Sequence, residues 1–206
     1  MPFSDYKTLA QVQTDYRIKY REQGFIAPRP WEPSSGFLSE FAFNRENMDM
    51  FSSEAARCQM VIFPIVREVY KHYCRTTSLW VRKPIAFDDK LNGTPDYIVS
   101  RRSELGKTVL EHPLLIVAEA KRNDFEQGWA QCLSELIAAR NLNLSERAVY
   151  GIVTDGKLWE FGRLEGDVFT KNTDSPTLTP LPGLFGALHA VFHMASHDPA
   201  SRDDGA

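Results

Sequence analysis

The stretch LLIVAEAK, residues 114–121, joins five consecutive apolar residues directly to the charged residues Glu119 and Lys121. An apolar run of this length is typical of a strand buried in the centre of a sheet. Side chains alternate along a strand with a period of two, so Glu119 and Lys121 point to the same face. A buried charge is costly unless it is paired or binds a metal ion. Two charges at the end of such a strand therefore predict a functional site.

A second acidic residue lies one predicted strand earlier. Thr94-Pro95-Asp96 precedes the β-favouring run Tyr97-Ile98-Val99-Ser100. If this run pairs with the apolar strand, the side chains of Asp96, Glu119 and Lys121 converge. Two carboxylates on neighbouring strands can then hold one divalent cation between them. Short motifs of this kind also occur by chance. The alternative is therefore that Asp96 is a turn or strand-end residue and that Glu119 and Lys121 form a solvated pair.

A helix is predicted from Phe125 to Arg140, after an N-cap at Asn123-Asp124. Apolar residues form one face at roughly helical spacing: Trp129, Cys132, Leu133, Leu136, Ile137 and Ala139. Gln131 belongs to the same helix, and an ordinary polar helix residue is the alternative interpretation for it.

The Pro95-Asp96 pair followed by Glu119-Ala120-Lys121 resembles the signature of the PD-(D/E)XK nuclease superfamily. The resemblance implies a metal-dependent enzyme that hydrolyses phosphodiester bonds, with DNA as the expected substrate. It implies that Mg²⁺ or Mn²⁺ is held by Asp96, by Glu119 and by the backbone carbonyl of Ala120. It also implies that Lys121 orients or helps to deprotonate the attacking water, or offsets charge in the transition state.

Gln131 is similar to the glutamine of the extended motif in the exonuclease-like branch of this superfamily. There the glutamine helps to position DNA or the water of the site, which implies a catalytic role for Gln131. That branch often has a tyrosine four residues further on, and this chain has Glu135 instead. The departure leaves the branch open.

The stretch YGIVTDGKLWEF, residues 150–161, resembles the region that follows the catalytic helix in restriction-related nuclease domains. These include the amino-terminal domain of type I restriction motor subunits. The residues themselves predict a strand over 148–154, a turn at Asp155-Gly156 and a second strand over 157–164. The resemblance covers roughly residues 51–164.

Nucleases of this kind often carry one more acid on a helix ahead of the sheet. The segment from Phe51 to Tyr73 predicts such a helix, and Pro64 is expected to kink or divide it. Glu54 and Glu68 are the two available acids. The resemblance of Ser-Glu-Ala-Ala to the leading helix of restriction-type members favours Glu54 as a metal ligand. The alternative is that Glu54 simply stabilises the helix N-terminus.

The expected fold is α/β, with a restriction-endonuclease-like core and a central mixed sheet of about four or five strands flanked by helices. The strand starting at Ala148 should lie parallel to the Glu119 strand, with the helix at 125–140 as the crossover. The expected division is an N-terminal extension over 1–50 that packs on the core, a nuclease-like domain over 51–195 and a disordered tail over 196–206. Within these, residues 7–20 suggest a short helix, and residues 170–182 suggest a loop.

Composition bounds the remaining function classes. The chain has 206 residues, 43% of them hydrophobic, which suffices for a full core, and no apolar run is long enough to span a membrane. Three cysteines without zinc-type spacing indicate a reducing compartment, so a cytoplasmic location is expected. His189 and His193 lie four apart, but no acid or cysteine pattern accompanies them.

The net charge of −3 does not by itself indicate nucleic-acid binding, although a local basic patch suffices for contact with phosphates. The candidate patches are two: Lys71, Arg75, Arg82 and Lys83, and separately Arg101, Arg102, Lys121 and Arg122. Cutting both strands needs two sites, so a homodimer is compatible with the prediction. The competing hypothesis is a catalytically inactive nucleic-acid-binding or assembly subunit that retains the nuclease fold.

Overall fold

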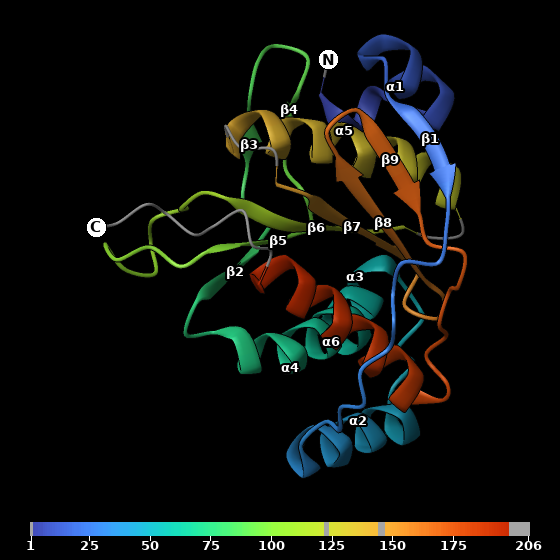
Figure 1. Ribbon diagram of the computed structural model, residues 1–206. Coiled ribbons are helices and arrows are strands. Elements are labelled where there is room, and N and C mark those ends of the chain that lie inside the picture. The colour runs from blue at the N-terminus through green and yellow to red at the C-terminus, as the bar shows by residue number, and fades with distance from the viewer. Residues whose placement is uncertain (1, 122–123, 144–146, 198–206) are drawn as a thin grey trace.

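A computed structural model describes residues 2–121, 124–143 and 147–197. Seven strands form one mixed sheet in the order β1-β9-β8-β7-β6-β5-β2 (Figure 1). The strands are β1 Lys19–Glu22, β2 Thr77–Val81, β5 Tyr97–Arg101, β6 Leu114–Ala120, β7 Val149–Thr154, β8 Trp159–Glu165 and β9 Val168–Lys171. The expected α/β class with a mixed sheet is confirmed, and the sheet is larger than the four or five strands expected.

The strand pairing around β6 positions the predicted site. Strand β6 lies antiparallel to β5 and parallel to β7. Helix α5, Phe125–Asn143, connects β6 to β7, so the predicted parallel neighbour beginning near residue 148 is confirmed. The antiparallel register places the start of β5 beside the end of β6, since Tyr97 pairs with Ala118.

The sequence analysis missed β1, at one edge of the sheet, and its neighbour β9. The helix expected over 7–20 is shorter, α1 Leu9–Tyr16, and the last two residues of that range already belong to β1, which pairs in parallel with β9. All four residues of β1 are exposed, so this strand has no alternation of apolar and polar residues. Strand β9 begins just ahead of the segment 170–182 that was expected to be a loop.

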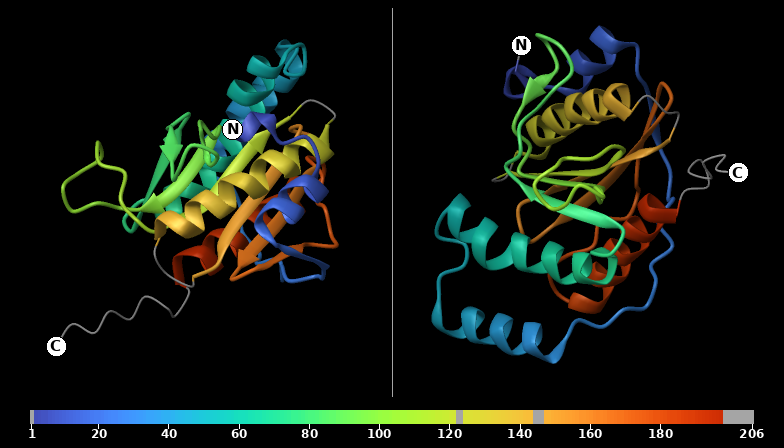
Figure 2. Two further views of the ribbon diagram at one scale, coloured as in Figure 1. Left: turned by 90° about the horizontal axis from the view of Figure 1, so that it is seen from above. Right: turned by 90° about the vertical axis from the view of Figure 1, so that its left-hand side faces the viewer.

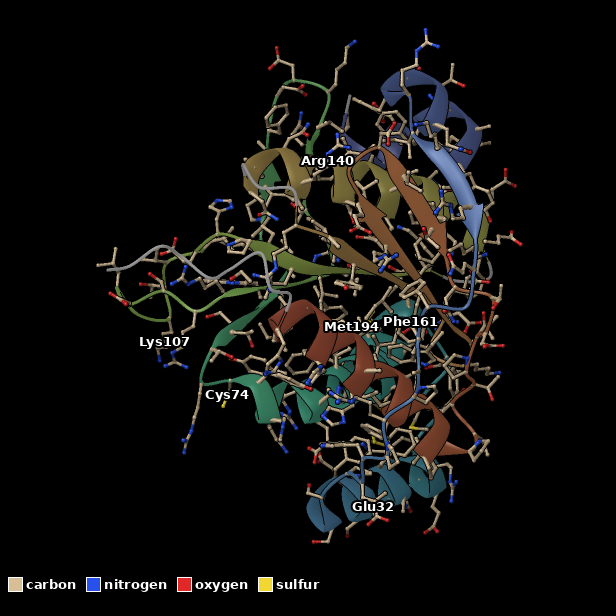
Figure 3. All side chains as sticks on the ribbon, in the orientation of Figure 1. Glu32, Cys74, Lys107, Arg140, Phe161 and Met194 are labelled. Carbon is tan, nitrogen blue, oxygen red and sulfur yellow. The ribbon has the colours of Figure 1, made fainter. Side chains whose placement is uncertain are left out.

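Helices cover both faces of the sheet (Figures 1 and 2). On one face α5 packs with α1 and with a short 3₁₀ turn, Phe3–Asp5. On the other face α4, Phe63–Tyr73, packs with α6, Leu181–His197, and α2, Ser35–Asn47, lies outside them. Figure 3 labels Phe161 of β8 and Met194 of α6, which belong to the core on this second face. The apolar residues of β6 therefore have helices on both sides, which explains why the run does not alternate.

The helix predicted over 51–73 is divided, as expected from Pro64. It begins as α3, Glu54–Arg57, widens into a π turn over Cys58–Ile62 and continues as α4. In the π turn the Phe63 N–H donates to the carbonyl of Cys58, five residues earlier. Pro64 has no N–H, and its ring crowds the preceding turn, so a wider turn just before it relieves the clash.

Two shorter features complete the fold. Strands β3, Ile85–Ala86, and β4, Asn92–Gly93, form a separate two-stranded sheet just ahead of Asp96. Among the helices of the described residues, none is long and apolar enough to cross a membrane.

Candidate active site

Asp96 and Glu119 lie side by side where β5 begins and β6 ends. The backbone N–H of Asp96 donates to Glu119 Oε1 at 3.2 Å. The backbone N–H of Ala120 donates to Asp96 Oδ2 at 3.0 Å. Each carboxylate is thus held by the other strand's backbone, and the structure brings together the two acids that the sequence analysis selected.

Lys121 shares a side of the sheet with Glu119. Its ammonium nitrogen lies 3.4 Å from Glu119 Oε2, and its backbone N–H donates to the carbonyl of Thr154 at 2.9 Å. This backbone bond extends the β6–β7 pairing by one residue, so Lys121 keeps the strand alternation that its spacing predicted. The three predicted residues Asp96, Glu119 and Lys121 therefore form one cluster.

Gln131 completes a chain of hydrogen bonds from the sheet into helix α5. Its side-chain nitrogen donates to Glu119 Oε2 at 2.8 Å and to Glu135 Oε1 at 3.1 Å. Gln131 is therefore no ordinary surface residue of the helix, because it is buried and orients the Glu119 carboxylate. The start of this helix is capped by Asp124, which accepts from the Gln127 N–H at 2.9 Å, whereas Asn123 lies outside the described residues.

Glu135 is a member of the site that the sequence analysis did not select. It is fully buried among apolar residues of α5, one turn beyond Gln131. A glutamate inside an apolar helix face was the signal available in the sequence, since such a residue needs a partner. The resemblance to the exonuclease-like branch showed only that Glu135 stands where that branch often has a tyrosine.

Burial and neighbouring carboxylates raise the pKa values of two carboxyl groups in the site. Burial, together with the negative charge of Asp96, raises the pKa of Glu119 to about 7. Burial and the charge of Glu119 raise the pKa of Glu135 well above its ordinary range. Its Oε2 atom has no hydrogen-bond partner among the described residues.

Arg82 and Lys121 supply the opposing positive charge. Arg82 Nη1 lies 3.0 Å from Asp96 Oδ1, and the Arg82 N–H donates to the carbonyl of Asp96 at 2.9 Å. Arg82 has a φ of 49°, an unfavourable backbone conformation for a residue other than glycine. Burial raises the pKa of Asp96, while the Ala120 N–H, Lys121 and Arg82 oppose that rise. The sequence analysis placed Arg82 in a basic patch but missed this ion pair.

The two candidates for an additional acid have different surroundings. Glu54 is exposed at the start of α3 and lines the same cavity as Asp96, Glu119 and Gln131. Glu68 does not line it. Glu68 is buried on α4, accepts from the Ser34 N–H at 2.9 Å and is paired with Lys71. Burial favours a higher pKa for Glu68, but these hydrogen bonds outweigh it and the pKa is lowered.

The cavity over the cluster has a volume of about 290 Å³. One side is formed by the β4 region, at Gly93 and Thr94, and another by residues 2–4 near the start of the chain. The sequence analysis assigned those N-terminal residues no part in the site. Phe3 packs so closely on Gly93 that a Cβ there would lie 2.6 Å from its ring, which holds the N-terminal segment against the cavity.

The donor set fits a magnesium or manganese ion. Mg²⁺ is commonly bound by one or two carboxylates, with water and substrate phosphate filling the remaining positions. Asp96 and Glu119 supply two carboxylates, which lie next to each other at the wall of one polar cavity. The residues described here contain no group of three or more His, Cys, Asp or Glu side chains suited to a metal, so the set does not fit a closed zinc site.

The second predicted basic patch is divided, because Lys121 lies in the cluster while Arg101 and Arg102 lie at the other end of β5. Arg101 ends that strand, and Arg102 donates to the carbonyl of Cys74 at 2.6 Å. Arg122 lies outside the described residues. Among the described residues, Arg82 and Lys121 are the cations that form ion pairs with Asp96 and Glu119.

No protein-family model and no curated protein gives a significant match to the chain.

Proposed function

We propose that this protein is a metal-dependent nuclease that hydrolyses phosphodiester bonds, with DNA as the expected substrate. One observation carries the proposal. Asp96, Glu119 and Lys121 converge at the adjoining ends of two paired strands, and Gln131 bonds to the same carboxylate. Two acids that can hold a divalent ion, with a lysine beside them in a polar cavity, support a site for phosphodiester hydrolysis.

Each residue has a role that follows from its contacts. Asp96 and Glu119, with the carbonyl of Ala120, would hold the ion. When bound, the ion supplies positive charge at the scissile phosphate and acidifies a water molecule. Lys121 lies 3.4 Å from Glu119 and so can orient that water and offset the charge that develops on the phosphate oxygens.

Gln131 acts through Glu119. Its amide donates to Glu119 Oε2, which fixes the direction in which the remaining lone pairs of that carboxylate point. The buried carboxyl of Glu135 accepts a second bond from the same amide and holds it in place. Glu54, which lines the cavity from the helix side, would complete the outer shell of the ion.

The first experiment is a cleavage assay on supercoiled plasmid, linear duplex and single-stranded DNA, each in Mg²⁺, Mn²⁺ or EDTA. The variant Lys121→Ala should lose cutting. Lys107→Ala is the matched control, because Lys107 is an exposed lysine in the loop after β5 (Figure 3). Full cutting by Lys121→Ala, or cutting in EDTA, would contradict the proposal.

One observation favours the alternative of an inactive binding or assembly subunit. Arg82 and Lys121 already pair with the two carboxylates, and the described residues offer no third acidic side chain close enough to form a metal cluster. Calorimetric titration with Mn²⁺ separates the two functions. A nuclease should bind the ion and lose that binding in Asp96→Asn, whereas an inactive site should bind it weakly in both proteins.

A further inference from the structure

A second cavity adjoins the first at Asp96. Its volume is about 350 Å³, and it shares Glu54, Arg82 and Asp96 with the polar cavity over the cluster. Its other walls come from α3, from the π turn, from the start of α4 and from the neighbouring ends of β2 and β5. These walls are formed by Ala55, Cys58, Gln59, Phe63, Val81 and Tyr97.

The walls of the second cavity are mainly apolar. The rings of Phe63 and Tyr97 are stacked, with centroids 6.1 Å apart and planes 16° apart. Val81 is 54% exposed at the end of β2, which is unusual for an apolar residue next to a charged site. An open apolar wall beside a catalytic carboxylate is a common feature of binding sites for organic ligands.

The π turn builds one wall of this cavity. It places Cys58 and Gln59 toward the space between α3 and β5, and the Tyr97 hydroxyl donates to the carbonyl of Cys58 at 3.4 Å. Single π turns inside α-helices occur frequently at functional sites. Here the turn and the hydrogen bond fix the wall with respect to Asp96.

Charged side chains of both signs line the second cavity, because Glu54 and Asp96 are acidic and Arg82 is basic. The side chain of Arg82 is 67% exposed between the two cavities. The guanidinium of Arg67 lies 5.6 Å from the centre of the Phe63 ring, and Arg67 is exposed. Apolar walls, with Arg82 between this cavity and the polar one, are complementary to a flat base that is joined to an anionic phosphate.

We propose that the second cavity binds an unpaired nucleobase of the DNA strand whose phosphate lies at Asp96 and Glu119. The base packs against Phe63, Val81 and Tyr97, and Arg82 meets the connecting phosphate. This inference rests on the proposed nuclease function and specifies its substrate: single-stranded DNA or an unpaired strand end. In an intact duplex the base is held inside the stack and is not free to enter such a cavity.

The test compares two single-stranded oligonucleotides that differ at one position. One is complete, and the other carries an abasic site next to the phosphate that the protein cuts. The unmodified protein should cut at the abasic position about tenfold to a hundredfold more slowly, the range expected when one base loses its packing against aromatic side chains. It should also cut single strands faster than a blunt duplex.

Two variants connect the base dependence to this cavity. Ala55→Leu places a larger side chain in the cavity and should cut the complete strand as slowly as the abasic one. Val81→Ala removes part of the wall at a half-exposed position, so it should fold normally and lose part of the discrimination. Ala10→Leu is the matched control, because Ala10 is an exposed alanine on α1 that lines neither cavity.

The outcomes separate this inference from the function on which it rests. Equal cutting of complete and abasic strands, or discrimination that survives in both Ala55→Leu and Val81→Ala, would overturn the base site and leave the nuclease standing. Absence of metal-dependent cutting on every substrate would overturn the nuclease, and the base site with it.

Discussion

Gly128 of helix α5 allows the helix to lie directly on the candidate site. A Cβ built at this position would lie 2.7 Å from Cγ1 of Val153 on β7 and 3.1 Å from Cγ of Lys121. Carbon atoms in ordinary contact are about 3.5–4.0 Å apart. The substitution Gly128→Ala should therefore push the helix, the strand or the lysine away from its present position.

The expected change in stability is the difference between two effects. Replacing glycine by alanine inside a helix contributes up to about 1 kcal/mol of stability. Overpacking a tight core costs about 1–3 kcal/mol, and Val153 is β-branched and buried, so it cannot rotate away easily. Gly128→Ala should lose about 0–3 kcal/mol. Because the flexible Lys121 side chain moves most readily, the cleavage rate should fall by about tenfold or more.

Urea unfolding and the cleavage assay measure these two effects on the same protein. Gly36→Ala is the control, because Gly36 belongs to helix α2 and nothing lies within 4 Å of a Cβ built there. That variant should gain up to about 1 kcal/mol and cut at the normal rate. If Gly128→Ala were also more stable and fully active, the close packing of α5 on Lys121 would be refuted.

Three further perturbations probe the carboxyl groups. Asp96→Asn can still accept the hydrogen bond from the backbone of β6, so the variant should unfold at the same urea concentration or a higher one. Its cutting rate should fall about a hundredfold or more. A strongly destabilised protein would contradict this expectation. Gln131→Leu removes the donor shared by Glu119 and Glu135 and should cost about 1–3 kcal/mol in urea unfolding, and an unchanged stability would speak against the bonded network. Glu68→Gln weakens the hydrogen bonds that lower the pKa of this carboxyl and should cost about 1–2 kcal/mol at pH 7. A lowered pKa gives stability that is present above the pKa of the unfolded chain and is lost as the pH falls through the folded value, so unfolding curves of this variant and the unmodified protein should converge in acid. A difference that stays constant with pH would show that the charge of Glu68 is not its source.

The local sequence pattern was sufficient to predict that Glu119 and Lys121 lie together at the end of a central strand. The apolar run ending in Glu119 and Lys121 has few alternatives to a central strand, and strand alternation fixes the relative direction of the two side chains. The position of Asp96 required one additional step, the pairing of β5 with β6, for which consecutive β-favouring runs are a good guide. These inferences depend on neighbouring residues in the chain.

The missed features depend on residues that are distant in the chain. Strand β1 is exposed along its whole length, so its sequence carries no pattern, and only its pairing with β9 makes it a strand. The bond between Gln131 and Glu135 is local, but its burial is set by packing against the sheet. The second cavity combines residues from two helices and two strands, and no single stretch of sequence indicates it.

The pairing of β1 with β9 also affects how the chain folds during synthesis. Residues 19–22 leave the ribosome long before residues 168–171, so this edge of the sheet cannot form until most of the protein has been made. Until α5 is available, the apolar side chains of Phe3, Tyr6 and Val12 lack their partners in the core. Contacts between such distant segments slow folding. The N-terminal wall of the candidate site is therefore expected to be completed late, and the nascent chain to need protection from aggregation until then.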